Sequence, residues 1–143
     1  MIGTLCVVML ASAAEQPTLP SDYPKLYELD ISKPHFAAYG AWHRAALKND
    51  YETYRKLSYS PVAVPDSMAL QIFQRYRVFA PDRVKIAEIE VLPKDAFSFT
   101  SIGCKDNRRY VSVVIVAKID ASWKVLGSEW GPPWNSSARV CPV

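Results

Sequence analysis

The sequence has few of the side chains from which metal, redox and phosphate sites are built. Its 143 residues include two histidines, three cysteines and five glycines. So few ligand-type side chains make a zinc site hard to assemble. The sequence also contains no glycine-rich phosphate motif and no serine-centred nucleophile motif. We therefore expect no metal ion and no other cofactor.

An excess of charge of one sign is also missing. The 17 Lys and Arg against 14 Asp and Glu leave a formal net charge of +3. Half of the residues are apolar and 22% are charged, which is typical of a globular chain and excludes a disordered one. The small positive balance is spread along the sequence, so it indicates no nucleic-acid partner. The length fits a single domain with its own core.

The first residues predict an export signal. Residues 2–14 are uncharged and mostly apolar, and they end in the small residues Ala11-Ser12-Ala13-Ala14. Small residues three apart before a polar stretch are typical of a signal-peptidase site. The apolar run is shorter than the roughly 20 residues that cross a bilayer as a helix. We expect 1–14 to be a signal peptide and the mature chain to be periplasmic or secreted, with no membrane span after cleavage. The alternative is a buried N-terminal strand.

Removal of this signal would leave two cysteines, Cys104 and Cys141. An even pair in an oxidising compartment predicts a disulfide. The bridge would close a loop of about 38 residues, which contributes on the order of 4 kcal/mol through loop-closure entropy. It would tether residues 131–143 as a C-terminal tail on the domain. Two unrelated thiols are the alternative.

Helical periodicity begins after a proline-rich arm over residues 15–33, which contains a short extended stretch at 25–29. Three helices are predicted, at 34–48, 50–57 and 66–79. His43 lies in the apolar stripe of the first helix. The buried face of the third is predicted to consist of Met68 (or Ala69), Ile72, Phe73, Tyr76 and Phe79.

After residue 83 the apolar period changes from 3.6 to two, which predicts four strands in meander order. Apolar parity slips between Ile86 and Ile89, which predicts a bulge near Ala87-Glu88. The strand at 110–119 is apolar on both faces and is expected to be central and covered on both sides. The predicted fold class is α+β, with three N-terminal helices packed on a strongly bent antiparallel sheet of about four strands, in a cone shape.

This order of elements resembles the nuclear transport factor 2-like superfamily, which has the cystatin-like cone fold, and in particular its exported bacterial members of unknown role. Two segments carry the resemblance, Ala-Leu-Lys-Asn-Asp-Tyr at 46–51 and Ile-Asp-Ala-Ser-Trp-Lys-Val-Leu at 119–126. The resemblance implies one domain over 34–130 and an apolar pocket at the open end of the cone. It also implies an Asp or His inside the cone in the enzymes of the superfamily, such as ketosteroid isomerases, and homodimers through the outer face of the sheet.

Three residues are candidates for acid–base chemistry. His43 could face the cone as a general base, and its alternative is a packed histidine with one nitrogen bonded to a backbone carbonyl. Glu88 could turn inward at the bulge, with a solvated carboxylate as the alternative. Glu129 shares the predicted strand face of Trp123 and Val125. The spacing yields no Asp/His pair, so no residue is assigned as catalytic.

Tryptophans near the C-terminus indicate a binding surface. The stretch Trp130-Gly131-Pro132-Pro133-Trp134 holds two indoles on a stiff backbone. We therefore expect an exported binding or interaction domain without catalysis, for a hydrophobic small molecule or a periplasmic protein, for example as an accessory or immunity protein. The alternative is an isomerase or dehydratase of the polyketide-cyclase kind, with His43 as base. The candidate binding residues are His43, Glu88, Trp123, Glu129, Trp130 and Trp134.

Overall fold

The computed structural model describes residues 26–131 and has an α+β fold. Its three helices are α1 (Pro34–Leu47), α2 (Tyr51–Leu57) and α3 (Asp66–Phe79). Its strands are β1 (Tyr27–Glu28), β2 (Arg83–Leu92), β3 (Ala96–Lys105), β4 (Arg108–Ile119) and β5 (Ser122–Gly127). The strands form one antiparallel sheet in chain order, β1-β2-β3-β4-β5. No helix in this part of the chain is long and apolar enough to cross a membrane.

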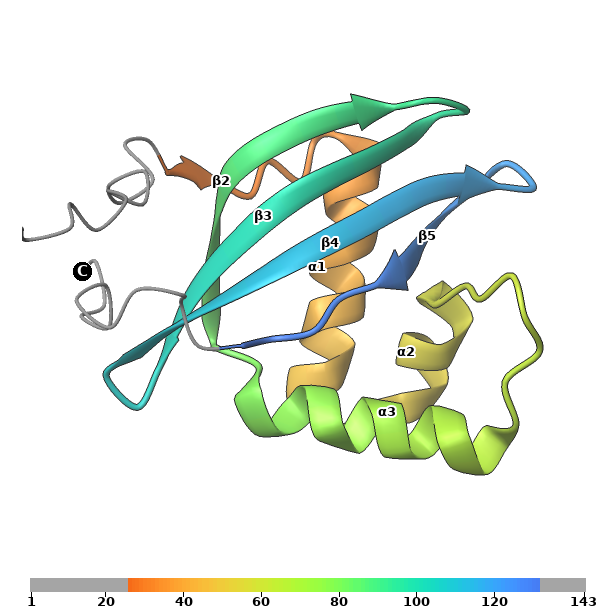
Figure 1. Cartoon of the computed structure of the whole chain (residues 1–143), viewed down its shortest axis with the longest axis horizontal. Helices are drawn as coiled ribbons and strands as arrows, with labels where there is room; N and C mark the ends of the chain where they lie inside the picture. The colour runs from red at the N-terminus through yellow and green to blue at the C-terminus, as the bar shows by residue number, and fades with distance from the viewer. Residues whose placement is uncertain (1–25, 132–143) are drawn as a thin grey trace, which may run out of the picture.

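The sheet bends around α1, which lies against its concave face (Figure 1). The first helix packs on β4 and β5, and α3 packs mainly on α1 and α2. As Figure 1 shows, α3 therefore lies across one end of the bent sheet and not flat on it.

The sheet has five strands, where the sequence predicted about four, and the helices do not come first. The additional strand, β1, lies in the predicted N-terminal arm and pairs Tyr27 with Ile86 and Glu28 with Lys85. An ion pair of 3.2 Å between Lys85 Nζ and Glu28 Oε1 joins the same two strands. Two residues are too few for an alternating pattern to show in the sequence.

The predicted bulge in β2 is confirmed. The pairing of β2 with β3 shifts between Ile86 and Ile89, which is where the apolar parity slips. A second shift, between Ile115 and Val116 in the pairing of β4 with β5, was not predicted. After this second shift Trp130 is buried, like Val125, whereas the side chain of Glu129 is 69% exposed. The expectation that Glu129 shares a face with Trp123 and Val125 is therefore corrected.

The break between the first two helices is confirmed. Asn49 adopts a left-handed conformation with φ of 59° and ends α1. The Asp50 side chain then accepts a hydrogen bond of 3.0 Å from the backbone N–H of Thr53 and caps α2. A turn of this kind needs residues that tolerate positive φ and that cap, and Asn-Asp supplies both.

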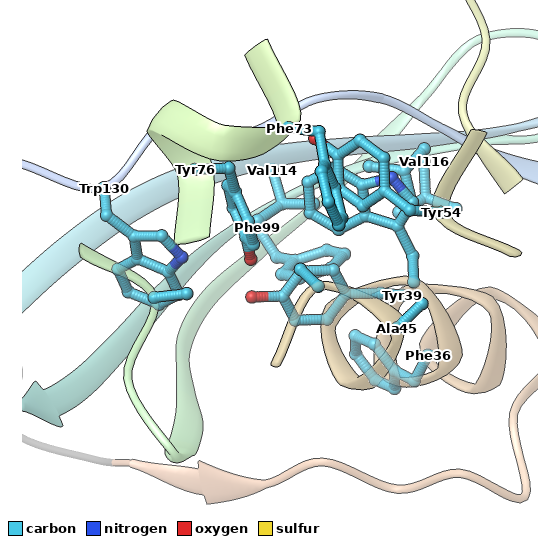
Figure 2. Packing of buried hydrophobic residues seen from close by; sticks show 14 of the residues in the cluster. Phe36, Tyr39, Ala45, Tyr54, Phe73, Tyr76, Phe99, Val114, Val116 and Trp130 are labelled. Carbon is cyan, nitrogen blue, oxygen red and sulfur yellow. The ribbon is translucent and has the colours of Figure 1, made fainter. Parts of the chain in front are cut away.

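Aromatic side chains fill the interior between α1, α3 and the sheet (Figure 2). Trp42 and Tyr54 stack with ring centroids 4.6 Å apart, and Tyr39 meets Phe99 edge-on at 5.1 Å. The buried aromatic residues are Phe36, Tyr39, Trp42, Tyr54, Phe73, Tyr76, Phe99 and Trp130. Side chains thus occupy the space where the cone fold implied an apolar pocket.

Two predicted buried surfaces are corrected. On α3, Phe73 and Tyr76 are buried as predicted, and of the alternatives Met68 and Ala69 it is Ala69 that is buried. Ile72 and Phe79 are exposed, contrary to the prediction. On β4, which is a central strand of the sheet as predicted, the outer face is not fully covered. The residues there include Val113 and Ile115, which are both exposed.

Candidate functional site

His43 lies on α1 inside the aromatic core, and both of its ring nitrogens are hydrogen-bonded. Nε2 is 2.8 Å from the carbonyl oxygen of Pro81, and Nδ1 is 2.5 Å from the Tyr76 hydroxyl. A carbonyl can only accept, so Nε2 carries the proton and donates it. Burial lowers the pKa of His43, and the Pro81 carbonyl offsets this only in part. The ring is therefore neutral near pH 7, and Nδ1 accepts the hydrogen bond from Tyr76.

This geometry matches the packed-histidine alternative. A general base must reach the proton that it removes, directly or through one water. In the observed arrangement Nε2 is committed to a backbone carbonyl and Nδ1 to a buried phenol. His43 thus positions Tyr76 and the Pro81 backbone, and it has no free nitrogen to offer to a substrate.

Three further buried polar atoms lie around this pair. Figure 2 shows the hydroxyls of Tyr39 and Tyr76 and the indole nitrogen of Trp130 pointing toward one another. Within residues 26–131, the Tyr39 hydroxyl, the Ser101 hydroxyl and the Trp130 nitrogen have no partner in hydrogen-bonding geometry. Burial raises the pKa of Tyr39, although the nearby hydroxyls of Ser101 and Tyr76 act to lower it. Both phenols therefore stay neutral, and the centre is polar without being charged.

Two surface cavities of about 210 Å³ each lie along the seam between α3 and the end of β5. They share Ile72 on α3 and Ser128 just after β5. The first is lined by Ile72, Arg75, Tyr76, Phe79, Ser128, Glu129 and Trp130. The second lies beside α2, and its lining includes Trp42, Tyr54, Tyr59 and Val125. We call the first cavity, with its α3 wall and its β5-side wall, the α3–β5 groove.

An ion pair spans the α3–β5 groove. Arg75 Nη2 and Glu129 Oε1 are 2.5 Å apart, and their side chains are 75% and 69% exposed. A pair this exposed contributes roughly 0–1 kcal/mol because water screens it. Deeper in the seam, the hydroxyls of Ser112 and Ser128 are 2.6 Å apart and join the segment after β5 to β4. The ion pair at the rim therefore links the two walls weakly, while the serine pair holds the β5-side wall to β4.

The structure brings three of the predicted site residues together. The rings of His43 and Trp130 are 6.0 Å apart, and Glu129 lies next to Trp130 at the groove rim. Trp123 lies elsewhere, on β5 beside the first turn of α1. Its ring is 5.6 Å from that of His35 and 5.7 Å from that of Phe97. Glu88 is exposed at the β2 bulge and does not turn into the core.

The remaining predictions concern residues outside the described part of the chain. Trp134, Cys141 and the signal peptide at 1–14 all lie there. The Cys104–Cys141 disulfide, the tail that it would tether and the export signal therefore stay predictions.

Sequence reasoning missed the partner of His43 and most of the groove. Tyr76 was predicted as a core residue of the third helix. The sequence did carry a signal for the partner of His43, because a tyrosine on a buried helix face needs a hydrogen-bond partner for its hydroxyl. No sequence signal marks Ile72 and Phe79 as groove residues, since their spacing is that of a buried stripe.

Comparison with solved structures identifies the fold. A protein from Xanthomonas campestris, assigned as a calcium/calmodulin dependent protein kinase II association domain, matches with a TM-score of 0.51 and 12% identity. That match covers 80% of this chain and 98% of the other. An NTF-2-like protein of unknown function from Shewanella oneidensis MR-1 matches with a TM-score of 0.45 and 18% identity, over 66% of this chain and 93% of the other. No protein-family model and no curated protein matches. The chain has the nuclear transport factor 2-like fold.

Proposed function

We propose that this nuclear transport factor 2-like domain is a binding domain without catalysis, and that it binds a protein partner at the α3–β5 groove. The fold is compatible with both binding and isomerase roles. The observation that carries the proposal is the state of His43, whose two nitrogens are both hydrogen-bonded inside a core filled with aromatic side chains.

The other acid–base candidates support the same conclusion. Glu88 is exposed at the bulge, and Glu129 is paired with Arg75 at the surface. An acid–base enzyme of this fold would need such groups to converge on a cavity that a substrate can enter. Of the three candidates, Glu129 lines the first of the two surface cavities, and His43 and Glu88 line neither of them. These positions favour a binding role over the polyketide-cyclase alternative.

Exposed apolar side chains favour the groove as the binding surface. Ile72 is 50% exposed and Phe79 is 42% exposed, and both lie on the α3 wall. Buried Trp130 lies on the opposite wall. Apolar side chains beside a surface cavity, with charged groups at the rim, are typical of interaction sites. A protein is a better fit than a small hydrophobic molecule, because the interior of the cone is occupied and the cavities lie at the surface.

The predicted cellular setting belongs to the same proposal. The signal peptide at 1–14 would place the domain in the periplasm or outside the cell, and the Cys104–Cys141 bridge would form there. An accessory or immunity protein acting on a partner in that compartment fits a small domain without its own chemistry.

Native mass spectrometry of the tagged chain recovered from its own cells tests the proposal. We expect a protein bound in fixed stoichiometry, lost in Ile72→Ser and kept in Leu70→Ser. Leu70 is the matched control because it is exposed on the same helix and lines neither cavity. A retained small molecule in place of a protein, or equal retention in both variants, would overturn the proposal.

A further inference from the structure

We infer that the α3–β5 groove takes an extended segment of its protein partner, which adds as a strand to the open edge of the chain after β5. This inference rests on the proposed binding function and goes beyond it by naming the binding mode. It is carried by the backbone of residues 126–131, by the helix wall opposite and by the cavity between them.

The chain already uses this edge of β5 once. Ser58 forms a parallel bridge with Val125, and the backbone N–H of Tyr59 donates to the Val125 carbonyl at 2.9 Å. A short extended piece of the chain is thus laid along the outer edge of β5 at this one position. Within residues 26–131, this pairing does not continue past Val125. The edge beyond Val125 is where a further strand would follow.

The direction of the backbone groups after β5 can be deduced from Gly131. Gly131 exchanges two hydrogen bonds with Val111 of β4, at 3.0 and 2.9 Å, so its backbone faces β4. Successive residues of an extended chain turn their backbone groups to opposite edges. The backbone groups of Trp130 and Ser128 therefore face away from β4, toward the groove. In the described part of the chain neither residue has a backbone hydrogen-bond partner. Unpaired groups of this kind are a template for an added strand.

The opposite wall of the groove is a helix face. Ile72 and Phe79 are seven residues apart, so they lie on the same side of α3, two turns from each other. A cavity of about 210 Å³ lies between this face of α3 and the residues after β5. A groove between a strand edge and a helix is a recurring way in which proteins bind extended peptides.

The groove also specifies the chemistry of the segment. Side chains of a strand alternate in direction, so every second residue would point to the apolar floor formed by Tyr76 and Trp130. The rim carries one positive and one negative side chain, Arg75 and Glu129, and thus selects no net charge. The expected segment has apolar side chains at alternate positions. Its own backbone would supply the donors and acceptors that a small hydrophobic ligand lacks.

The test uses the full chain and a defined probe. A phage library of random twelve-residue peptides is selected on the immobilised protein, and the most enriched peptide is synthesised with an N-methyl group at each position in turn. We expect N-methylation at every second position to weaken binding about tenfold or more, since it removes a strand hydrogen bond. Methylation at the positions between should have little effect. The bound peptide should slow hydrogen exchange at the Ser128 amide. Phe79→Ser should weaken binding, while Val78→Ser, an exposed neighbour on α3, should not.

Other outcomes count against the inference. If the bound peptide is lost in Phe79→Ser but shows no alternation on N-methylation, the proposed function stands and strand addition is wrong. If no peptide is enriched, or if Phe79→Ser leaves binding of the peptide unchanged, both the proposed function and strand addition fail. Slow hydrogen exchange of the Ser128 amide in the free chain, at every protein concentration, would mean that the chain itself covers the edge after β5. Hydrogen exchange that becomes slower as the protein concentration rises would mean that a second copy of the chain covers this edge. Either result overturns a partner strand.

Discussion

His43, Tyr76 and Pro81 show how one hydrogen-bond chain organises the core. The imidazole accepts from a phenol on α3 and donates to the carbonyl of the residue two positions before β2. Each bond has its direction fixed, because the carbonyl cannot donate and the ring is neutral. The histidine therefore links α1 to the end of α3 and to the segment that leads into β2, and its contribution is to structure.

Removal of the Tyr76 hydroxyl tests this role. In Tyr76→Phe the Nδ1 of His43 is left buried without a donor, so we expect the free energy of unfolding to fall by about 1–3 kcal/mol. The control is Tyr51→Phe, which removes an exposed and long hydrogen bond of 3.4 Å to the Asp66 carbonyl, and should change stability by less than about 0.5 kcal/mol. Urea unfolding followed by fluorescence measures both. Equal losses in the two variants would mean that the His43–Tyr76 bond carries no particular stability.

The buried histidine also predicts a pH dependence of stability. Burial lowers the pKa of His43 in the folded chain, so the unfolded chain binds the proton more tightly at this residue. Its contribution to stability is fully present above the usual histidine pKa of about 6.5 and is lost as pH falls through the lower folded-state pKa. In NMR spectra of the folded chain, we expect the His43 ring to titrate with a midpoint below pH 6.5. A midpoint at or above 6.5 would contradict a neutral, packed ring.

Among the larger elements, the contact between β3 and the turn before β2 fixes the position of the Pro81 carbonyl. Gly103 on β3 lies directly against the Pro81 ring, so a methyl group at position 103 would sit 2.1 Å from Pro81 Cγ and 2.8 Å from the Arg83 carbonyl oxygen. Only a residue without a side chain fits there. The strand thereby helps to hold the acceptor that His43 uses.

A pair of glycine substitutions tests this contact. Gly103→Ala should lower the free energy of unfolding by about 1–3 kcal/mol, because the backbone must shift to accept the methyl group. Gly127→Ala, where nothing lies within 4 Å of the added carbon, should be neutral within about 0.5 kcal/mol. Thermal unfolding of both variants is sufficient. If Gly103→Ala is as stable as Gly127→Ala, the close approach to Pro81 is not a constraint on the fold.

Several elements could be predicted from sequence because their signal is local. The β2 bulge shows as a slip in apolar parity at Ile86 and Ile89, and the Asn49-Asp50 break shows as a helix end followed by a cap. The extended stretch predicted at 25–29 contains β1, but its pairing with β2 was not predicted, since two residues carry no period. The register shift in β5 depends on the pairing with β4, which the sequence of β5 does not encode alone, and it decided the placement of Glu129.

The candidate site was predictable only in part for a related reason. Helical spacing places His43 on the buried face of α1 and Tyr76 on the buried face of α3, and both placements are confirmed. Spacing within a helix does not say which residues of two helices meet, so the pair itself was missed. Ile72 and Phe79 had the spacing of buried residues, and their exposure follows from the way α3 crosses the end of the sheet.

The molecule as a whole has a filled interior and an open seam at its side. Aromatic side chains occupy the cone, and the two cavities of about 210 Å³ lie at the surface between α3 and the end of β5. A binding surface at the seam requires no opening of the core. We therefore propose that the α3–β5 groove is the binding surface and that the polar centre around His43 has a structural role.

The most direct test of this account is calorimetric titration of the recovered partner into the wild-type chain, Phe79→Ser and Val78→Ser. The two substitutions remove neighbouring exposed side chains on α3, and of the two residues only Phe79 lines the groove. We expect Phe79→Ser to weaken binding about tenfold or more, which corresponds to loss of a central apolar contact of roughly 1.4 kcal/mol or more. Val78→Ser should bind as the wild type does. Equal affinity for all three chains would contradict the assignment of the groove as the binding surface.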